Sequence, residues 1–128
     1  MSAMSNLLEN EILDHILSVG SYTMPTAVYL GLSVASMGEA ADGTELSGSG
    51  YARQAVTFSA ASSGTTSNSG AVTFPTATGS WGDVGFWSIW DAASSGNMLL
   101  HGSFTTAKTI ATGDVLRVSA GDLDITAA

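Results

Sequence analysis

The sequence predicts a mainly β protein, in which a jelly-roll-like β-sandwich follows one N-terminal amphipathic α-helix. Apolar residues recur at helical spacing only near the N-terminus, and beyond Pro25 they alternate as in strands. The later apolar runs are short and separated by turn signals rich in Gly, Ser and Asn, which is typical of two packed antiparallel sheets. A chain of 128 residues has the length of one domain. We therefore expect a single domain over residues 1–128, with the helix at about 6–19 and the sandwich at about 26–127.

The predicted helix has recognisable signals at both ends. Asn6 is a preferred N-cap residue, and Glu9 three positions later completes a capping box. Gly20 is the expected C-cap. One half of the helical wheel collects the apolar residues, namely Leu8, Ile12, Leu13, Ile16 and Leu17.

Seven or eight short segments downstream have the alternation or the residue types of strands. Two of these runs, 84–90 and 98–104, flank a turn and are expected to form a hairpin. We expect a long acidic loop at 35–50, which carries Glu39, Asp42 and Glu45, and a small polar loop at 59–69. The expected strands lie at 27–34, 51–58, 71–74, 84–90, 98–104, 108–110, 115–118 and 123–126.

The most β-prone run, 84–90, is apolar on both faces. Simple alternation places Val84, Phe86 and Trp90 on one face, where we expect core positions, and Trp87 and Ile89 on the other. A strand that is apolar on both faces is central in a sandwich or covered by another chain.

Composition excludes several classes of function. Lys and Arg total 3 against 11 Asp and Glu, which gives a net charge of −8 and argues against nucleic-acid binding. Without cysteine there is no disulfide framework and no thiolate metal site, and two distant histidines supply too few ligands for zinc. No apolar run approaches membrane-spanning length, and the first residues lack a secretory-signal pattern. We expect no cofactor, no metal, no nucleic-acid partner and no membrane partner.

An enzymatic role also lacks support. No serine lies in a Gly-x-Ser-x-Gly elbow, and the acidic residues have no spacing that selects a catalytic pair. We predict no catalytic residue and no enzyme activity.

The aromatic residues and one arginine are the best candidates for binding. Aromatic side chains on a β-sandwich stack on sugars in some proteins, but they form a core or a subunit interface more often. Arg53 is one of only three cations in an acidic chain, so a specific carboxylate partner is expected. The predicted partner-binding residues are Tyr51, Arg53, Trp81 and Trp87.

Several segments, in this order, resemble a group of small structural proteins of tailed bacteriophages. The resemblance covers most of the chain and departs from the group's pattern at 35–47 and 86–90. It supplies no catalytic residue. The matching segments are 8–17, 50–58, 71–82 and 91–99, followed by 108–110 and the pair Gly113 and Asp114.

The resemblance implies a virion protein that is made in the host cytoplasm. Members of the group are similar to capsid cement or decoration proteins, and they are often labelled tail-fibre proteins. The leading expectation is a cement protein that bridges major capsid subunits in many symmetric copies, with the N-terminal helix or a loop reaching a neighbour. The alternative is a tail-fibre, tail-tip or baseplate component, with or without contact with a carbohydrate receptor. Expected partners are the major capsid protein or other virion proteins, and further copies of the chain.

Overall fold

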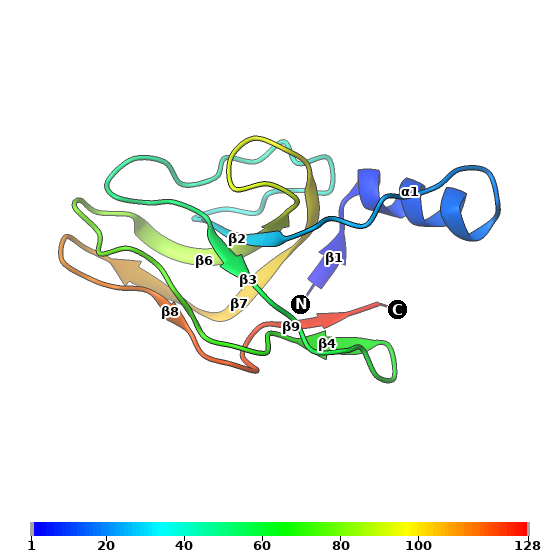
Figure 1. The fold of residues 1–128 in the computed structure, drawn as a ribbon. Coiled ribbons are helices and arrows are strands. Elements are labelled where there is room, and N and C mark those ends of the chain that lie inside the picture. Colours follow the sequence, from blue (N-terminus) through cyan, green and yellow to red (C-terminus); the bar gives the residue numbers. More distant parts are fainter. Residues whose placement is uncertain (1, 128) are drawn as a thin grey trace.

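The protein consists of two β layers with one helix at the N-terminal end (Figure 1). The structure, a computed structural model, describes residues 2–127, so the two terminal residues of the predicted 1–128 domain lie outside it. The first layer is a five-stranded antiparallel sheet with the order β1-β7-β6-β2-β3. Its strands are β1 (Ser2–Met4), β7 (Met98–Ile110), β6 (Gly82–Trp90), β2 (Val28–Ser33) and β3 (Gln54–Val56).

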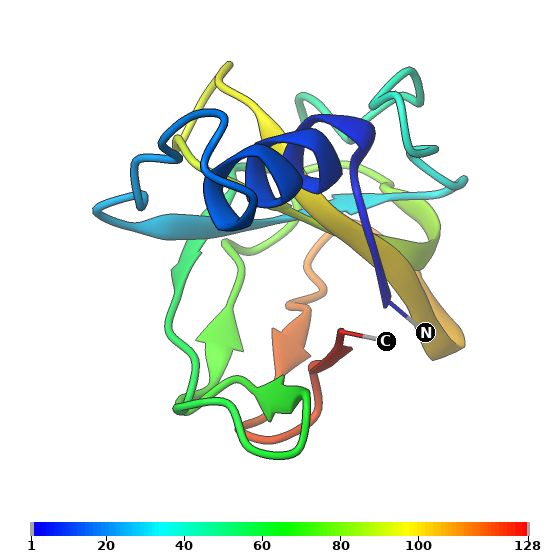
Figure 2. The same ribbon diagram turned by 90° about the vertical axis from the view of Figure 1, so that its right-hand side faces the viewer.

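The second layer consists of two short antiparallel ladders below the five-stranded sheet (Figure 2). One ladder pairs β4 (Thr65–Ser67) with β9 (Asp124–Thr126), and the other pairs β5 (Val72–Thr73) with β8 (Arg117–Val118). The prediction of a mainly β protein with antiparallel sheets and an N-terminal helix is confirmed.

The main core lies between the layers and draws on both. Leu30 and Leu32 of β2 are fully buried, because alternation along the strand directs both side chains inward. They pack in one cluster with Phe74, Leu116 and Leu123 from the second layer. Leu46, Tyr51 and Phe58 lie at its margin.

An irregularity between β6 and β7 changes which side chains of β6 share a face. The pairing register shifts between Val84 and Phe86, so the simple alternation is interrupted there. Val84, Trp87 and Ile89 consequently share the main core, with exposed fractions of 1%, 2% and 1%. Placing Val84 with Phe86 and Trp90 was wrong, because Trp90 packs in a separate cluster with Met37 and Met98.

The helix α1 (Asn6–Ile16) is shorter than predicted. Its N-cap is Ser5 rather than Asn6, and the Ser5 side chain accepts a hydrogen bond from the Leu8 amide at 3.2 Å. The helix ends before Gly20, because Ser18 takes the left-handed backbone conformation (φ 65°) and the amides of Val19 and Gly20 bond back to the carbonyl oxygen of Asp14.

Some boundaries in the sheets also differ from the prediction. The 108–110 segment belongs to the long strand β7, and the predicted strand 51–58 is reduced to β3. Residues 65–67, expected in a loop, form β4, and β1 was not predicted. The two ends of the described chain lie side by side, since the amide of Thr126 donates a hydrogen bond to the Ser2 hydroxyl at 3.0 Å (Figure 1).

Candidate interaction surfaces

The acidic loop at 35–50 folds back along β2, where β3 no longer pairs with this strand. The β2–β3 register ends at Leu30 opposite Gln54. Beyond it, the Leu46 amide donates to the Leu32 carbonyl at 2.9 Å, and the Leu32 amide donates to the Tyr51 hydroxyl at 3.0 Å. The loop and the residue after it therefore satisfy backbone groups of β2 that would otherwise be buried without partners.

A charged pair fixes this loop to the sheet. Arg53 Nη2 lies 2.8 Å from Glu45 Oε1, and Arg53 Nε lies 2.9 Å from Glu45 Oε2, which is bidentate geometry. The side chains of Arg53 and Glu45 are only 7% and 18% exposed. The remaining guanidinium nitrogen, Nη1, donates to the carbonyl oxygens of Ala92 and Ser95 at 2.9 and 2.8 Å. The carboxylate partner expected for Arg53 is thus present within its own chain.

Tyr51 connects this pair to an aromatic cluster. Its hydroxyl donates to Glu45, and burial followed by this hydrogen bond raises the pKa of Tyr51 well above its usual value. Its ring is stacked with Phe74 at a centroid distance of 6.2 Å and meets the edge of Trp81 at 5.6 Å. Trp81 Nε1 donates to the Ser49 carbonyl at 2.9 Å, which ties the end of the acidic loop to the core.

Three of the four predicted partner-binding residues therefore lie together, but the contacts that they make in the structure are within their own chain. Tyr51, Arg53 and Trp81 hold the acidic loop, whereas Trp87 lies apart in the core opposite Leu32. Trp81 and Trp87 are 5% and 2% exposed, and the third tryptophan, at position 90, is 8% exposed. None of the three tryptophans offers an open ring face to a sugar in this conformation. Contact of the four residues with a partner stays a prediction.

A different part of the molecule presents apolar side chains to solvent. Only Leu8 of α1 is buried, although the helix was predicted to have a complete apolar side. Leu13, Ile16 and Leu17 are 56%, 68% and 66% exposed, and Glu9 lies in the same stripe because positions i, i+4, i+7 and i+8 share a helix face. We call Glu9, Leu13, Ile16 and Leu17 the exposed stripe.

The exposed stripe belongs to a helix with little support from its own chain. The helix has 11 residues, and isolated helices shorter than about 12–15 residues are marginally stable in water. It projects from one side of the sandwich (Figure 1). A hollow of about 490 Å³ between α1, β1 and β9 is lined in part by Glu9, Ile12 and Leu13. An exposed apolar surface of this kind indicates an interface.

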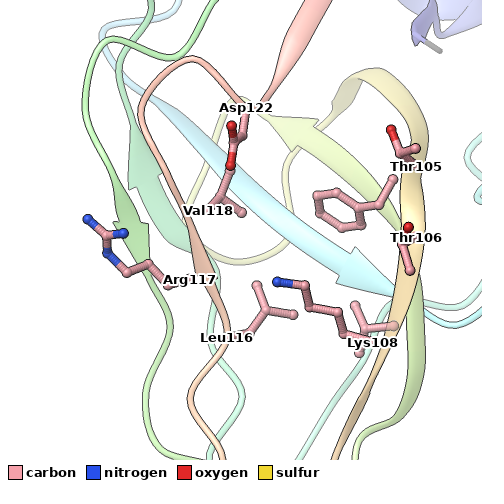
Figure 3. Close-up of a pocket in the computed structure, with 9 residues that line it drawn as sticks. Thr105, Thr106, Lys108, Leu116, Arg117, Val118 and Asp122 are labelled. Carbon is pink, nitrogen blue, oxygen red and sulfur yellow. The ribbon is translucent and has the colours of Figure 1, made fainter.

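A second surface is the groove at the open edge of the sandwich, where β7 and β8 face each other (Figure 3). β1 pairs only with residues 100–102 of β7, so the later part of β7 is an edge. The groove has a volume of about 280 Å³. We call it the edge groove, and its lining is Val84, Phe104, Thr105, Thr106, Lys108, Leu116, Arg117, Val118 and Asp122.

Both cations that remain after Arg53 lie at the edge groove, but only the Lys108 side chain extends into it, while Arg117 points outward (Figure 3). The chain has three Lys and Arg residues in total, and the other two are Lys108 and Arg117. Within residues 2–127, the one ion pair joins Arg53 to Glu45, so neither groove cation has a carboxylate partner there. This surface was not predicted from the sequence, although the scarcity of cations was a signal that each one has a specific position.

The residues present do not point to a metal site or a membrane span. Over residues 2–127, no three His, Asp or Glu side chains gather in a way that would hold a metal ion. No helix in that part of the chain is both long and apolar enough to cross a bilayer.

The fold and these surfaces define a small β-rich module with two candidate contact surfaces, the exposed stripe and the edge groove. The family model described as "Podophage GP4 fiber I protein gp80" matches residues 3–126, and the chain belongs to this family. No curated protein matches the sequence. The chain is therefore a structural component of a phage virion, and its family is one of fibre proteins rather than enzymes. Its partners are other virion proteins. The match supports the fibre alternative better than the capsid-cement expectation.

Proposed function

We propose that this chain is a non-enzymatic component of a podophage fibre, held in the fibre through the exposed stripe of α1. The family match over residues 3–126 is the observation that carries this proposal. The structure adds a physical reason for an assembly role, since α1 leaves Leu13, Ile16 and Leu17 uncovered. The rigid sandwich serves as a spacer, because the clamp around Arg53 and Glu45 holds its longest loop against the sheet.

The position in the virion is tested by labelling purified particles with gold-conjugated antibodies against the chain and imaging them by electron microscopy. We expect label on fibres at the tail and a copy number, from quantitative mass spectrometry, far below that of the major capsid protein. Label spread over the head, with a copy number close to that of the major capsid protein, would overturn the fibre proposal in favour of capsid decoration.

The role of α1 in retention is tested separately with phages that encode Leu13→Gln/Ile16→Gln. Glutamine is a good helix former, so the change removes apolar surface while the helix remains possible. We expect the variant chain to be lost from purified virions. Val34→Gln is the matched control, because Val34 is 50% exposed but lies outside α1. Equal retention of both variants would contradict a role for the exposed stripe.

A further inference from the structure

We propose that the exposed stripe of one copy docks into the edge groove of a second copy. This contact rests on the proposed function, because it names a neighbour of the chain within the fibre. The two surfaces differ from each other, so the contact is heterologous: each copy offers its stripe to one neighbour and its groove to another. Heterologous contacts build closed rings or open filaments, depending on whether the rotation between copies closes.

The first argument comes from Glu9. This carboxylate lies on the same helix face as Leu13 and Ile16, so docking of the apolar side chains also takes Glu9 out of water. A desolvated carboxylate is costly unless a cation meets it. The surface that receives the stripe must therefore combine apolar side chains with at least one Lys or Arg.

The edge groove has this combination. Val84, Phe104 and Leu116 line it, and Lys108 brings a positive charge, whereas the Arg117 side chain points away from the groove (Figure 3). Figure 3 shows the Lys108 ammonium extending across the groove towards Leu116, where an incoming carboxylate would meet it. Asp122 also lines the groove, so a carboxylate lies in the same surface as the Lys108 ammonium.

The positions of the two surfaces require two copies. The helix α1 projects at one side of the sandwich, whereas the β8 side with the end of β7 lies at the other (Figures 1 and 2). The stripe of a given copy therefore does not reach its own groove in this fold. Placing two stripes against each other would bring acidic helices together, since Glu9, Glu11 and Asp14 all belong to α1. Charge complementarity favours the stripe-to-groove contact.

The volume of the edge groove limits how much of a docked helix it can accommodate. About 280 Å³ accommodates a few side chains and not a whole helix. The helix therefore lies along the mouth of the groove, with Leu13 and Ile16 inserted. The exposed part of β7, which includes Thr105 and Thr106, then forms one rim of the contact.

The test uses the full chain and two complementary variants in sedimentation-velocity experiments over a range of protein concentrations. The stripe variant is Leu13→Gln/Ile16→Gln, and the groove variant is Lys108→Glu. We expect the wild type to associate as its concentration rises, and added salt to weaken the association because the contact includes charges. Each variant alone should remain monomeric. Val34→Gln should associate like the wild type.

The decisive measurement mixes the two variants in equal amounts. The stripe variant keeps an intact groove, and the groove variant keeps an intact stripe, so the mixture retains one complete contact. We expect a 1:1 complex that does not grow further. Circular dichroism on each variant checks that the sheets are retained, and the altered side chains in α1 are solvent-exposed.

Three outcomes would overturn the inference: a wild type that stays monomeric at its highest soluble concentration, a groove variant that associates like the wild type, or a mixture that forms no complex. These outcomes are distinguishable from failure of the fibre proposal, because virion labelling reports the location of the chain independently of self-association. A fibre-located chain that is monomeric in solution would assign the exposed stripe to a different virion protein.

Discussion

The guanidinium carbon of Arg53 lies 3.8 Å from the centre of the Trp90 ring, so the same side chain that pairs with Glu45 also covers an aromatic face. This cation–π contact is stronger when the cation is shielded from water. Arg53 thereby joins the acidic loop, the sheet and the β6–β7 turn in one place. The conformation of the acidic loop should therefore depend strongly on this pair.

The first prediction concerns the charged pair. Removing one partner, by Glu45→Gln or Arg53→Met, leaves the other without its counter-ion in a partly buried site. We expect each single variant to lose roughly 3 kcal/mol of unfolding free energy. The double variant should lose clearly less than the sum of the two, which urea denaturation in a double-mutant cycle would measure. Strictly additive losses would contradict coupling between Glu45 and Arg53.

The second prediction concerns alkaline pH. The pKa of Tyr51 is raised in the folded protein, so above the unfolded-state pKa of about 10 the unfolded chain releases a proton that the folded chain keeps. Stability is then fully present below pH 10 and falls as pH rises further, by up to about 1.4 kcal/mol per pH unit for one proton.

Tyr51→Phe isolates this effect. It should lower stability at neutral pH, because Glu45 loses a hydrogen bond, and it should also flatten the decline above pH 10. Part of the slope will remain, since burial together with Asp91 and Glu11 raises the pKa of Tyr22 as well. Chemical denaturation at several pH values checks this, and an unchanged alkaline slope in the variant would refute the assignment to Tyr51.

The third prediction concerns Gly31, which faces the acidic loop from β2. A Cβ atom at this position would lie 2.8 Å from Glu45 Oε2, 3.0 Å from Ser88 Oγ and 3.1 Å from Trp90 Nε1. Gly31→Ala should therefore displace Glu45 and lower unfolding free energy by about 1–3 kcal/mol. Gly70→Ala is the matched control, since no atom lies within 4 Å of its added Cβ. Thermal unfolding measures the difference, and equal melting temperatures for the two variants would argue against tight packing at Gly31.

The fourth prediction concerns the start of α1. Ser5 is the N-cap and is 2% exposed, whereas Asn6 is exposed and lies inside the helix. Ser5→Ala should lower unfolding free energy by about 1 kcal/mol, and Asn6→Ala should change it little. Guanidinium denaturation of both variants distinguishes the two positions. A larger loss of unfolding free energy in Asn6→Ala than in Ser5→Ala would support Asn6 as the N-cap, as the sequence predicted.

The fifth prediction concerns Trp87, which the sequence offered as a contact residue. It is 2% exposed in the main core, so Trp87→Ala should lower unfolding free energy by about 3–5 kcal/mol. Any loss of partner binding in this variant would then follow from unfolding. Intrinsic fluorescence and thermal melting check the effect, and a fully stable Trp87→Ala would contradict the core position.

The periodicity of apolar residues predicted the main elements, but it did not predict the features that depend on tertiary contacts. The apolar spacing located α1 and the β6–β7 hairpin, because one buried face imposes a regular pattern. β1 and β4 are three residues each, too short to show any period, and they exist because β7 and β9 pair with them. The register shift in β6 depends on β7 and is invisible in either strand alone.

The candidate site also has features that the sequence alone does not reveal. Residue type led to the prediction of Tyr51, Arg53, Trp81 and Trp87 as partner-binding residues, and this stays a prediction. The contacts of Glu45 with Tyr51 and Arg53, and of Trp81 with Ser49, become apparent only when the acidic loop is folded. Lys108 and Arg117 come from different strands, and only the topology brings them to one groove. Whether α1 packs on its own chain cannot be read from its amphipathic pattern, because the pattern is the same for an internal or an external surface.

The hydrogen bond between Thr126 and Ser2 has a practical consequence for engineering. A short peptide linker would join the two ends of the described chain, and a new opening at the exposed Ser21 would leave every β ladder uninterrupted. Such a circular permutant would move α1 to the C-terminal end while its neighbours in space stayed the same.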